Sequence, residues 1–284
     1  MPASSEVPIS HPNGHFYSPV TDPAEFEQRL AQLYPTAPEA PGIDFNDFAH
    51  TELLGTVFPP LLRDYDYPEE GSSDCKLTRF YTRNSQFSWL DSRALFALMR
   101  HWQPRRVIEV GSGYSSLLMA DVNRRFLGSR SRITCIEPYP RPFLSSPESG
   151  IDLIAQKVQD VEIAEFAQLE ANDLLFIDSS HVCKTGSDVT YLYLQVLPRL
   201  KRGVRVHVHD IFLPCEYPVD WVIGQNRSWN EQYLLQAMLM FSTRFRVLLG
   251  ANYAQLRFPQ LVARALAHPR GIGYGGGSFY FEVV

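Results

Sequence analysis

The residues best suited to chemistry lie in two short segments, DSSH (178–181) and HVHD (207–210), each at the end of an apolar run. Histidine moves protons near neutral pH because its reference pKa is about 6.5, and carboxylates beside it bind divalent metal ions. The sequence therefore predicts a site for proton transfer, with or without a metal ion. Its predicted catalytic residues are Asp178, His181, His209 and Asp210.

A second chemical signal is the glycine turn in VIEVGSGYSS (107–116). Gly111 and Gly113 allow a tight turn and a close approach by a ligand, and free N–H groups at the helix start that follows hold polar or anionic groups. Glu109 precedes this turn and suits the amino end of a zwitterion. A dinucleotide site would have a third glycine where this chain has Ser116, so a nicotinamide dehydrogenase is disfavoured.

Further acidic residues follow the next two predicted strands in order. Glu137 is placed to accept hydrogen bonds from ribose hydroxyls, and Asp160 from an adenine amino group, with Val161 as a backbone donor. Open α/β sheets bind ligands at the carboxyl ends of their strands, which is where these residues fall. The predicted cofactor-binding residues are Glu109, Gly111, Ser112, Gly113, Ser115, Glu137, Pro138, Asp160, Val161 and Asp178.

Apolar runs alternate with helical patterns over most of the chain, which predicts an α/β fold with a parallel sheet. The last strand follows no crossover helix, so we expect it to be antiparallel. The predicted strands are 105–110, 132–138, a segment of 151–159, 172–178, 203–211, 244–250 and 278–284. The predicted helices are 91–100, 115–126, 189–200 and 230–241.

Residues 1–85 differ in character from the rest, because their first half is rich in Pro, Ser and Gly. They contain two helical patterns, near 23–33 and 45–62. We expect this part to be an N-terminal extension to an α/β domain over 86–284. Its segment NGHFYSP (13–19) is a candidate lid over the substrate, since lids exclude water from reactions.

The composition excludes some functions. A net charge of −5 over 284 residues, without a run of like charges, predicts no nucleic-acid partner. No apolar stretch reaches about 18 residues, so we expect no membrane span, and the N-terminus lacks a signal peptide's pattern. Four cysteines without a CxxC pair predict reduced thiols and a cytoplasmic location. A homo-oligomer is compatible with all of this.

Residues 105–211 resemble a class I S-adenosylmethionine-dependent methyltransferase. VIEVGSGYSS resembles the first motif of that superfamily, and CIEPYP (135–140) resembles the second. FIDSSH (176–181) and VHVHDIF (206–212) resemble strand-end motifs of small-molecule O-methyltransferases of catechol or macrolide-sugar type. NGHFYSP and VGSGYSS together look like a bacterial group of methyltransferase-like proteins of mostly unassigned substrate. The resemblance implies a Rossmann-like doubly wound sheet and S-adenosylmethionine as cofactor.

The resemblance also implies roles for the strand-end residues. In catechol-type enzymes two such carboxylates bind Mg²⁺, which places Asp178 and Asp210 as ligands. The asparagine that completes that ligand set is replaced here by Ile211, which cannot coordinate, so waters or His209 are left to complete the shell. A histidine beside carboxylates suits Mn, Fe or Zn better than Mg. His181 stands where that family has a lysine as general base, and we expect it to take that role.

Three functions are open at this point. The first is methyl transfer to a small-molecule acceptor, as an O-methyltransferase or, as a close variant, an N-methyltransferase. The second is a metal-dependent oxygenase or hydrolase on the same scaffold, with His181, His209 and Asp178 or Asp210 as metal ligands. The third is an S-adenosylmethionine-binding protein without turnover, which the change at Ile211 favours.

Aromatic residues are candidates for the walls of the substrate pocket. Of the two alternating histidines in the last segment, His207 lies deeper in its strand and is expected to be a packed core residue, whereas His209 is expected at the site. The aromatic candidates are Phe16, Tyr17, Trp89, Tyr114, Phe212, Tyr217 and Trp221.

Overall fold

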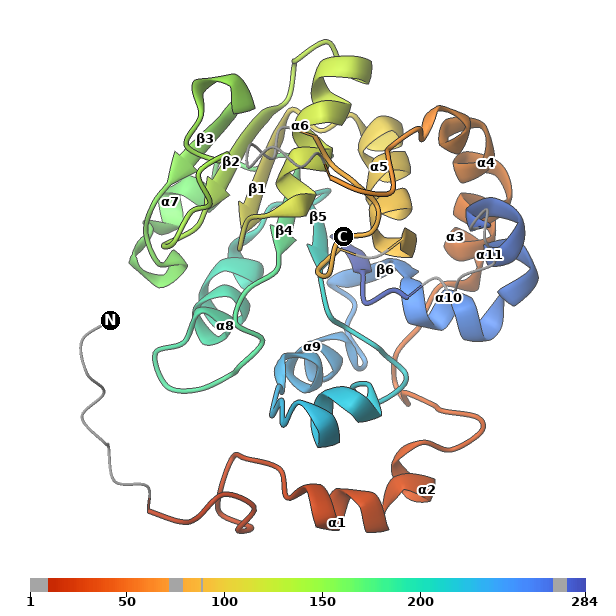
Figure 1. The fold of residues 1–284 in the computed structure, drawn as a ribbon, viewed down its shortest axis with the longest axis vertical. Coiled ribbons are helices and arrows are strands. Elements are labelled where there is room, and N and C mark those ends of the chain that lie inside the picture. Colours follow the sequence, from red (N-terminus) through yellow and green to blue (C-terminus); the bar gives the residue numbers. More distant parts are fainter. Residues whose placement is uncertain (1–9, 72–78, 88, 268–274) are drawn as a thin grey trace.

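A seven-stranded sheet forms the centre of the protein (Figure 1), whose computed structural model describes residues 10–71, 79–87, 89–267 and 275–284. The strand order is β3-β2-β1-β4-β5-β7-β6. The strands are β1 (Arg106–Val110), β2 (Arg132–Ile136), β3 (Ile151–Ile154), β4 (Leu174–Ile177), β5 (Arg205–Val208), β6 (Phe245–Gly250) and β7 (Phe279–Val283).

The strand directions confirm a Rossmann-like, mostly parallel sheet with an antiparallel last strand. Strands β1 to β5 pair in parallel, and β7 runs antiparallel to both β5 and β6. The chain moves outward from β1 to β3 on one side and from β4 to β5 on the other. The strand order therefore reverses between β1 and β4, and such a switch point is where doubly wound sheets bind ligands.

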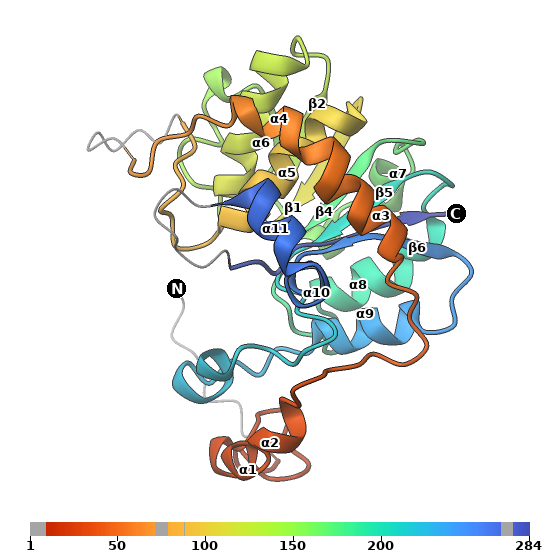
Figure 2. The same ribbon diagram turned by 90° about the vertical axis from the view of Figure 1, so that its right-hand side faces the viewer.

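Helices cover both faces of the sheet, as a buried parallel sheet requires (Figure 2). Alternate residues of each strand enter different cores: Val107 packs with α5 (Trp89–Trp102) and α6 (Tyr114–Phe126), and Ile108 packs on the opposite face. The first core also takes in α10 (Ala251–Arg257) and α11 (Pro259–Leu266). The second core is covered by α7 (Ile163–Phe166), α8 (Asp188–Tyr191) and α9 (Glu231–Leu239).

Several helical segments differ from the prediction in extent. The pattern near 45–62 forms one run of short helical pieces, and the helix predicted at 189–200 consists of α8 and two tighter or wider turns. No element was predicted for α10 and α11, although Pro259 and the apolar spacing of Val262, Ala265 and Leu266 are helix signals. The remaining segments are α1 (Pro23–Gln28), α2 (Leu30–Leu33), α3 (Asp47–Glu52), η1 (Leu53–Val57), α4 (Phe58–Leu61), η2 (Leu62–Asp64), η3 (Pro147–Ser149), η4 (Val158–Asp160), η5 (Leu192–Val196), η6 (Leu197–Arg199) and η7 (Asp220–Gly224).

The N-terminal part divides into a loosely attached and a packed region. Helices α1 and α2 bury none of their residues, and they meet the rest of the protein beside η7, where the Thr21 N–H donates to Ser228 Oγ at 3.1 Å. The run from α3 to η2 instead packs on α5, and Phe58 lies in the same core as Phe96. The run from α3 to η2 shares the core beneath the sheet, although it precedes residue 85. A domain boundary at residue 85 therefore stays a prediction.

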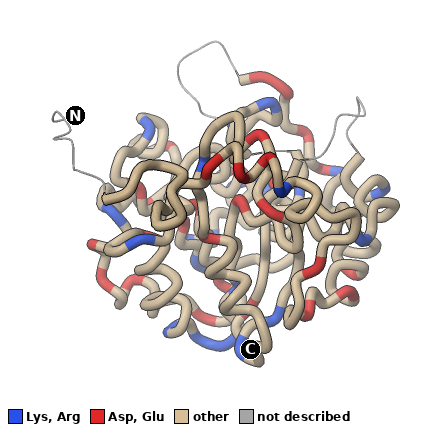
Figure 3. Tube along the Cα trace, turned by 90° about the horizontal axis from the view of Figure 1, so that it is seen from below, with Lys and Arg blue, Asp and Glu red and all other residues tan. Residues whose placement is uncertain are grey.

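Both charge signs are distributed along the described trace (Figure 3). Within the described ranges, no helix combines the length and the apolar character needed to cross a lipid bilayer. Cys135, Cys183 and Cys215 are free thiols, and Cys75 lies outside the described residues.

Candidate active site

A cavity of about 440 Å³ opens at the carboxyl ends of β1, β4 and β5. This volume lies in the range of small-molecule sites. Of the predicted site residues, it is lined by Gly111, Ser112, Gly113, Ser115, Glu137, Asp178, His181, His209 and Asp210. The predicted residues that do not line it are Glu109, Pro138, Asp160 and Val161.

The turn after β1 is shaped by the neighbouring end of β4. Gly111 has φ +78°, and a Cβ atom there would lie 1.7 Å from the carbonyl oxygen of Asp178. Gly113 has extended backbone, and a Cβ atom there would meet only the Gln86 side chain at 3.9 Å. The two glycines therefore differ: Gly111 is required by the fold, whereas Gly113 leaves open space in the cavity.

Glu109 differs from its predicted role. It is fully buried, and it accepts hydrogen bonds from the hydroxyls of Ser115 and Ser116, both at 2.5 Å, and from the Cys135 thiol at 3.1 Å. Burial raises the pKa of Glu109 to about 7, although these three donors oppose that rise. Its carboxyl group thus ties β1 and β2 to the start of α6 and does not face the cavity.

Ser116 explains how the turn works without a third glycine. Its hydroxyl donates to Glu109 and accepts the Gly113 N–H at 3.0 Å. This caps the first turn of α6. The other N–H groups of the turn also have partners, since Gly111 donates to the Ile136 carbonyl at 3.1 Å and Ser112 donates to Glu137.

Glu137 lies where the sequence predicts, directly after β2 and in the cavity lining. Its carboxylate accepts the Tyr139 N–H at 2.8 Å and the Ser112 N–H at 3.3 Å. These two bonds hold the side chain against the glycine turn. A carboxylate has about four acceptor positions, so it keeps capacity for two ribose hydroxyls.

The predicted adenine contacts lie outside the cavity. Asp160 is exposed, and the Val161 N–H donates to the Val158 carbonyl at 3.1 Å. The structure differs from the expectation here because the turn after β3 uses that donor internally. An adenine contact at this turn stays a prediction.

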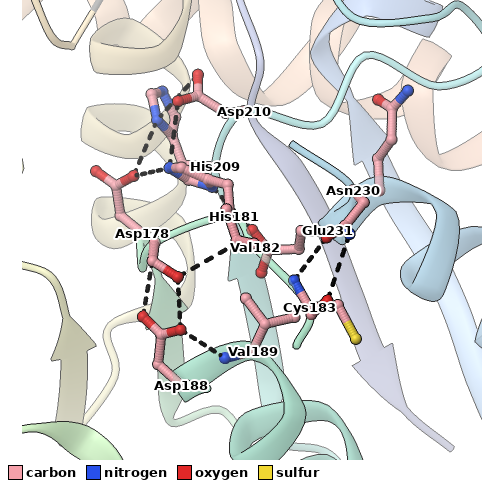
Figure 4. A network of polar contacts seen from close by, with 12 residues as sticks. Asp178, His181, Val182, Cys183, Asp188, Val189, His209, Asp210, Asn230 and Glu231 are labelled. Atoms are coloured by element: carbon pink, nitrogen blue, oxygen red, sulfur yellow. Dashed lines mark hydrogen bonds and ion pairs between the residues drawn. The ribbon is translucent and has the colours of Figure 1, made fainter. Parts of the chain in front are cut away.

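His181 sits at the centre of the acidic cluster (Figure 4). Its Nε2 lies 3.5 Å from carboxylate oxygens of both Asp178 and Asp210, and its Nδ1 lies 2.8 Å from Glu231 Oε2. His181 has a positive φ of 62°, and its carbonyl accepts the backbone N–H groups of Asn230 and Glu231. The start of α9 thereby fixes the imidazole ring in the cavity wall.

Glu231 is the functional residue that sequence reasoning missed. It is fully buried and comes from α9, about fifty residues after His181. Its only sequence signal is an acidic residue in the first turn of a helix, which is a common helix-stabilising feature. Here the carboxylate accepts a hydrogen bond from the imidazole. This arrangement orients histidines in catalytic and metal sites.

The charges of the cluster set its protonation. Burial opposes a charge on His181, but hydrogen bonds and charges from Asp178 and Glu231 outweigh burial and raise the pKa of His181 to about 10. Burial acts against ionisation of Asp178, yet the charge of His209 and hydrogen bonds from both histidines hold the pKa of Asp178 well below its usual range. Burial raises the pKa of Asp210. The cluster is therefore a strongly coupled set of opposite charges.

The two histidines of β5 and its end have different environments. His207 is buried between the rings of Phe176 and Tyr280, with centroids 3.9 and 4.1 Å away, and burial holds its pKa well below the usual value. This confirms the prediction of a core histidine. His209 lines the cavity, with its Nδ1 3.4 Å from Asp178 and its Nε2 3.4 Å from Asp91.

The acidic cluster also has the donors for a divalent cation. Ligand atoms of Asp178, His181 and Asp210 all lie within 4.8 Å of one another. The structure thus groups with the carboxylates His181, a ligand in the predicted two-histidine metal site, and not His209, the histidine predicted for the magnesium-type site. Ile211, which replaces a ligand of catechol-type enzymes, is buried in the apolar core. Two carboxylates and an imidazole whose other nitrogen bonds a carboxylate fit a metal site, with Mn, Fe or Zn suited at least as well as Mg.

Aromatic residues form one wall of the cavity. The ring centroid of Trp229 lies 4.3 Å from that of His181 with the rings tilted by 37°, and the Trp221 centroid lies 5.2 Å from that of Trp229. Of the predicted aromatic candidates, Trp221 and Tyr114 line the cavity. Phe16 and Tyr17 are exposed, and no residue from 10 to 34 lines the cavity, so the predicted lid does not cover it in this conformation.

The chain is 38% identical over 178 residues to an uncharacterized protein of Archaeoglobus fulgidus, and the match covers 59% of this chain and 77% of that protein. A family model described as a methyltransferase domain matches residues 108–211, which span the glycine turn and the acidic cluster. Residues 108–211 form a methyltransferase domain, and the sheet that holds them has the topology expected of the class I S-adenosylmethionine-dependent type. The motif resemblance is thereby confirmed, and this methyltransferase's cavity lies where the matched motifs meet.

Solved methyltransferases show weaker likeness. MycE from the mycinamycin biosynthetic pathway, in complex with Mg, SAH and mycinamycin VI, is 17% identical with a TM-score of 0.32, covering 55% of this chain and 37% of that one. The structure described as cmcI-D160 Mg-SAM is 11% identical, with a TM-score of 0.40 and coverage of 91% and 95%. Coclaurine N-methyltransferase with N-methylheliamine and SAH is 10% identical, with a TM-score of 0.36 and coverage of 92% and 90%. The match spans less than half the length of the MycE chains.

The two glycines of the turn provide a matched test of this geometry. Gly111→Ala should destabilise the methyltransferase by about 3 kcal/mol or more, because the new Cβ would collide with the Asp178 carbonyl at a strained φ. Gly113→Ala should lower the free energy of unfolding by no more than about 1 kcal/mol. Urea unfolding measures both. Equal effects of the two substitutions would contradict the described turn.

Proposed function

We propose that this methyltransferase methylates a hydroxyl oxygen of a small-molecule acceptor, with His181 as general base. The observation that carries the proposal is that the glycine turn with Glu137 and the cluster around His181 open into one cavity. A displacement at a methyl group needs the acceptor aligned and its proton removed, and both requirements can be met there.

The cofactor side is formed by the residues around the glycine turn. Bound S-adenosylmethionine would supply the methyl group on a sulfonium. The residues proposed to hold it are Gly111, Ser112, Gly113, Ser115, Glu137 and Asp178. Glu109 acts on this side as a positioning residue, because it fixes Ser115 and the first turn of α6.

The acceptor side is formed by His181 and its acidic partners. Glu231 fixes the imidazole through Nδ1, so that Nε2 points into the cavity beside Asp178 and Asp210. Nε2 is the atom that takes the proton of the acceptor hydroxyl. In this function a divalent cation would be held by the carboxylates of Asp178 and Asp210 and not by His181, whose Nε2 must stay free for the proton. The cation would lower the pKa of that hydroxyl and offset the negative charge that raises the pKa of His181.

Other parts of the account remain proposals of the same kind. We propose a cytoplasmic location and a separable N-terminal extension, which the loose packing of α1 and α2 supports. Homo-oligomer formation stays a prediction. Sedimentation of the full chain tests for the homo-oligomer, and limited proteolysis in the stretch from 34 to 45 tests whether the N-terminal extension is separable.

The proposed cofactor side is tested by titrating the protein with S-adenosylhomocysteine in a calorimeter. Wild type should bind with a dissociation constant near the micromolar range, about −8 kcal/mol. Glu137→Ala should weaken binding at least about tenfold, because each lost hydrogen bond to a carboxylate is worth about 1.5–3 kcal/mol. Glu148→Ala, an exposed glutamate outside the cavity, is the control. Absence of binding by wild type would remove the basis of the proposal.

The proposed base is tested by turnover with an acceptor found in a panel of small hydroxyl compounds. His181→Asn should lower kcat by about 10²–10⁴-fold while the affinity for S-adenosylhomocysteine stays within about twofold. Glu231→Gln should lower kcat by about 10–100-fold, because the ring loses its orienting carboxylate. Glu148→Gln should change neither value. Full turnover by His181→Asn would contradict the assignment.

The grouping of Asp178, His181 and Asp210 also keeps the metal-dependent oxygenase or hydrolase as a second candidate. Metal analysis of the purified protein separates the two functions. Stoichiometric iron together with no methyl transfer would favour the second candidate.

A further inference from the structure

Arg227 occupies the aromatic wall of the cavity, next to the proposed acceptor site. Its guanidinium carbon lies 4.2 Å from the centroid of the Trp221 ring and 4.5 Å from that of Trp229. The Arg227 N–H donates to the Trp221 carbonyl at 2.8 Å, which folds the segment after η7 back on itself. Contact with two indole rings holds the guanidinium in place through cation–π attraction.

The charge of Arg227 has no partner of its own. In the described ranges, no carboxylate oxygen lies within 4.0 Å of its guanidinium nitrogens, and no hydrogen bond of its side chain is formed. The indole contacts use none of the guanidinium's hydrogen-bond donors, so its N–H groups remain for a ligand. The second arginine of the cavity, Arg141, is different: it donates to Gln86 at 2.7 Å and lies over Tyr114, at the start of α6.

Arg227 lies on the acceptor side because of Trp229. This indole contacts the guanidinium at 4.5 Å and the His181 ring at 4.3 Å, so the cation and the proposed base lie against the same ring. The glycine turn follows β1, whereas Trp221, Arg227 and Trp229 follow β5. A molecule whose hydroxyl meets His181 can reach Arg227 with a group about one ring width away.

The cavity carries acidic as well as basic side chains. Asp178, Asp210 and Glu137 all line it. An anionic acceptor therefore needs a cation placed away from these carboxylates, and the N–H edge of an arginine matches a carboxylate through two parallel hydrogen bonds.

We propose that Arg227 binds the carboxylate of the acceptor, and that the acceptor is a hydroxylated carboxylic acid whose two groups lie across a ring-sized spacer. This inference rests on the proposed O-methyl transfer. Arg227 would then select the class of substrate without taking part in the methyl transfer itself.

The test uses para-hydroxybenzoate as probe, with its methyl ester and its amide as uncharged matches. Calorimetric titration of the full chain at saturating S-adenosylhomocysteine should show the acid binding at least about tenfold more tightly than either match. Arg227→Gln should remove that preference by weakening the acid alone, and Arg227→Lys should retain part of it. Arg199→Gln, an exposed arginine outside the cavity, should keep the full preference.

The outcomes separate this inference from the proposed function. Equal affinity for acid and ester, failure of the acid to bind while S-adenosylhomocysteine binds, or an unchanged preference in Arg227→Gln would each overturn the role of Arg227. Unchanged affinity for S-adenosylhomocysteine shows that the variants are folded. If the acid binds through Arg227 but is not methylated, the inference stands and the O-methyl transfer fails.

Discussion

The site depends on the parallel pairing of β1 with β4. Val110 lies opposite Ile177, the Asp178 N–H donates to the Val110 carbonyl at 2.8 Å, and Gly111 passes directly over the Asp178 carbonyl. The residues after β1 form the glycine turn, and those after β4 form the acidic cluster. One register therefore sets the separation between the proposed cofactor and acceptor groups. A slip by one residue would exchange the faces of β1 and expose the Glu109 carboxyl group to an apolar core.

The second constraint is the satisfaction of buried charge. Three carboxyl groups lie 2.8–3.5 Å from the nitrogens of two histidines in this cluster. Both histidines and Glu231 are buried, and Asp178 and Asp210 are partly buried. Buried charges are stable when they are paired, so the histidines hold the carboxylates in place and the carboxylates raise the pKa of the histidines. The same balance responds to any cation or proton that enters. A cluster of this kind suits proton transfer, because small changes in its charge alter which group carries the proton.

Local sequence patterns were sufficient for the parts of this site that are local. A buried strand followed by glycines or an acidic residue predicts both the sheet and the strand-end position of Gly111, Glu137 and Asp178, because parallel strands end at one edge. Patterns were insufficient where the partner comes from elsewhere in the chain. Glu231 reads as an ordinary helix-start glutamate, and only the packing of α9 under His181 gives it a role. The residue type and strand position of Glu109 predicted a role in cofactor binding. Its carboxylate instead points away from the cavity, because Ser115, Ser116 and Cys135 donate hydrogen bonds to it.

The aromatic wall shows the same division. Trp221 was a candidate because the loop after β5 is rich in aromatics, whereas nothing in the sequence signals that Arg227 would lie against two indoles without an acidic partner. Helices α10 and α11 were not predicted, although the sequence contains the apolar spacing of a helix in this region. The sequence was therefore sufficient to predict a helix there.

A crystal structure of the complex with S-adenosylhomocysteine tests the central claim most directly, since that claim is that the cofactor and the acceptor groups share the cavity at the β1–β4 edge. The account predicts the homocysteine end against the turn from Gly111 to Ser115, the ribose on Glu137, and the sulfur on the side facing His181. A ligand bound away from this edge, or a cavity that stays empty at saturating concentration, would contradict it.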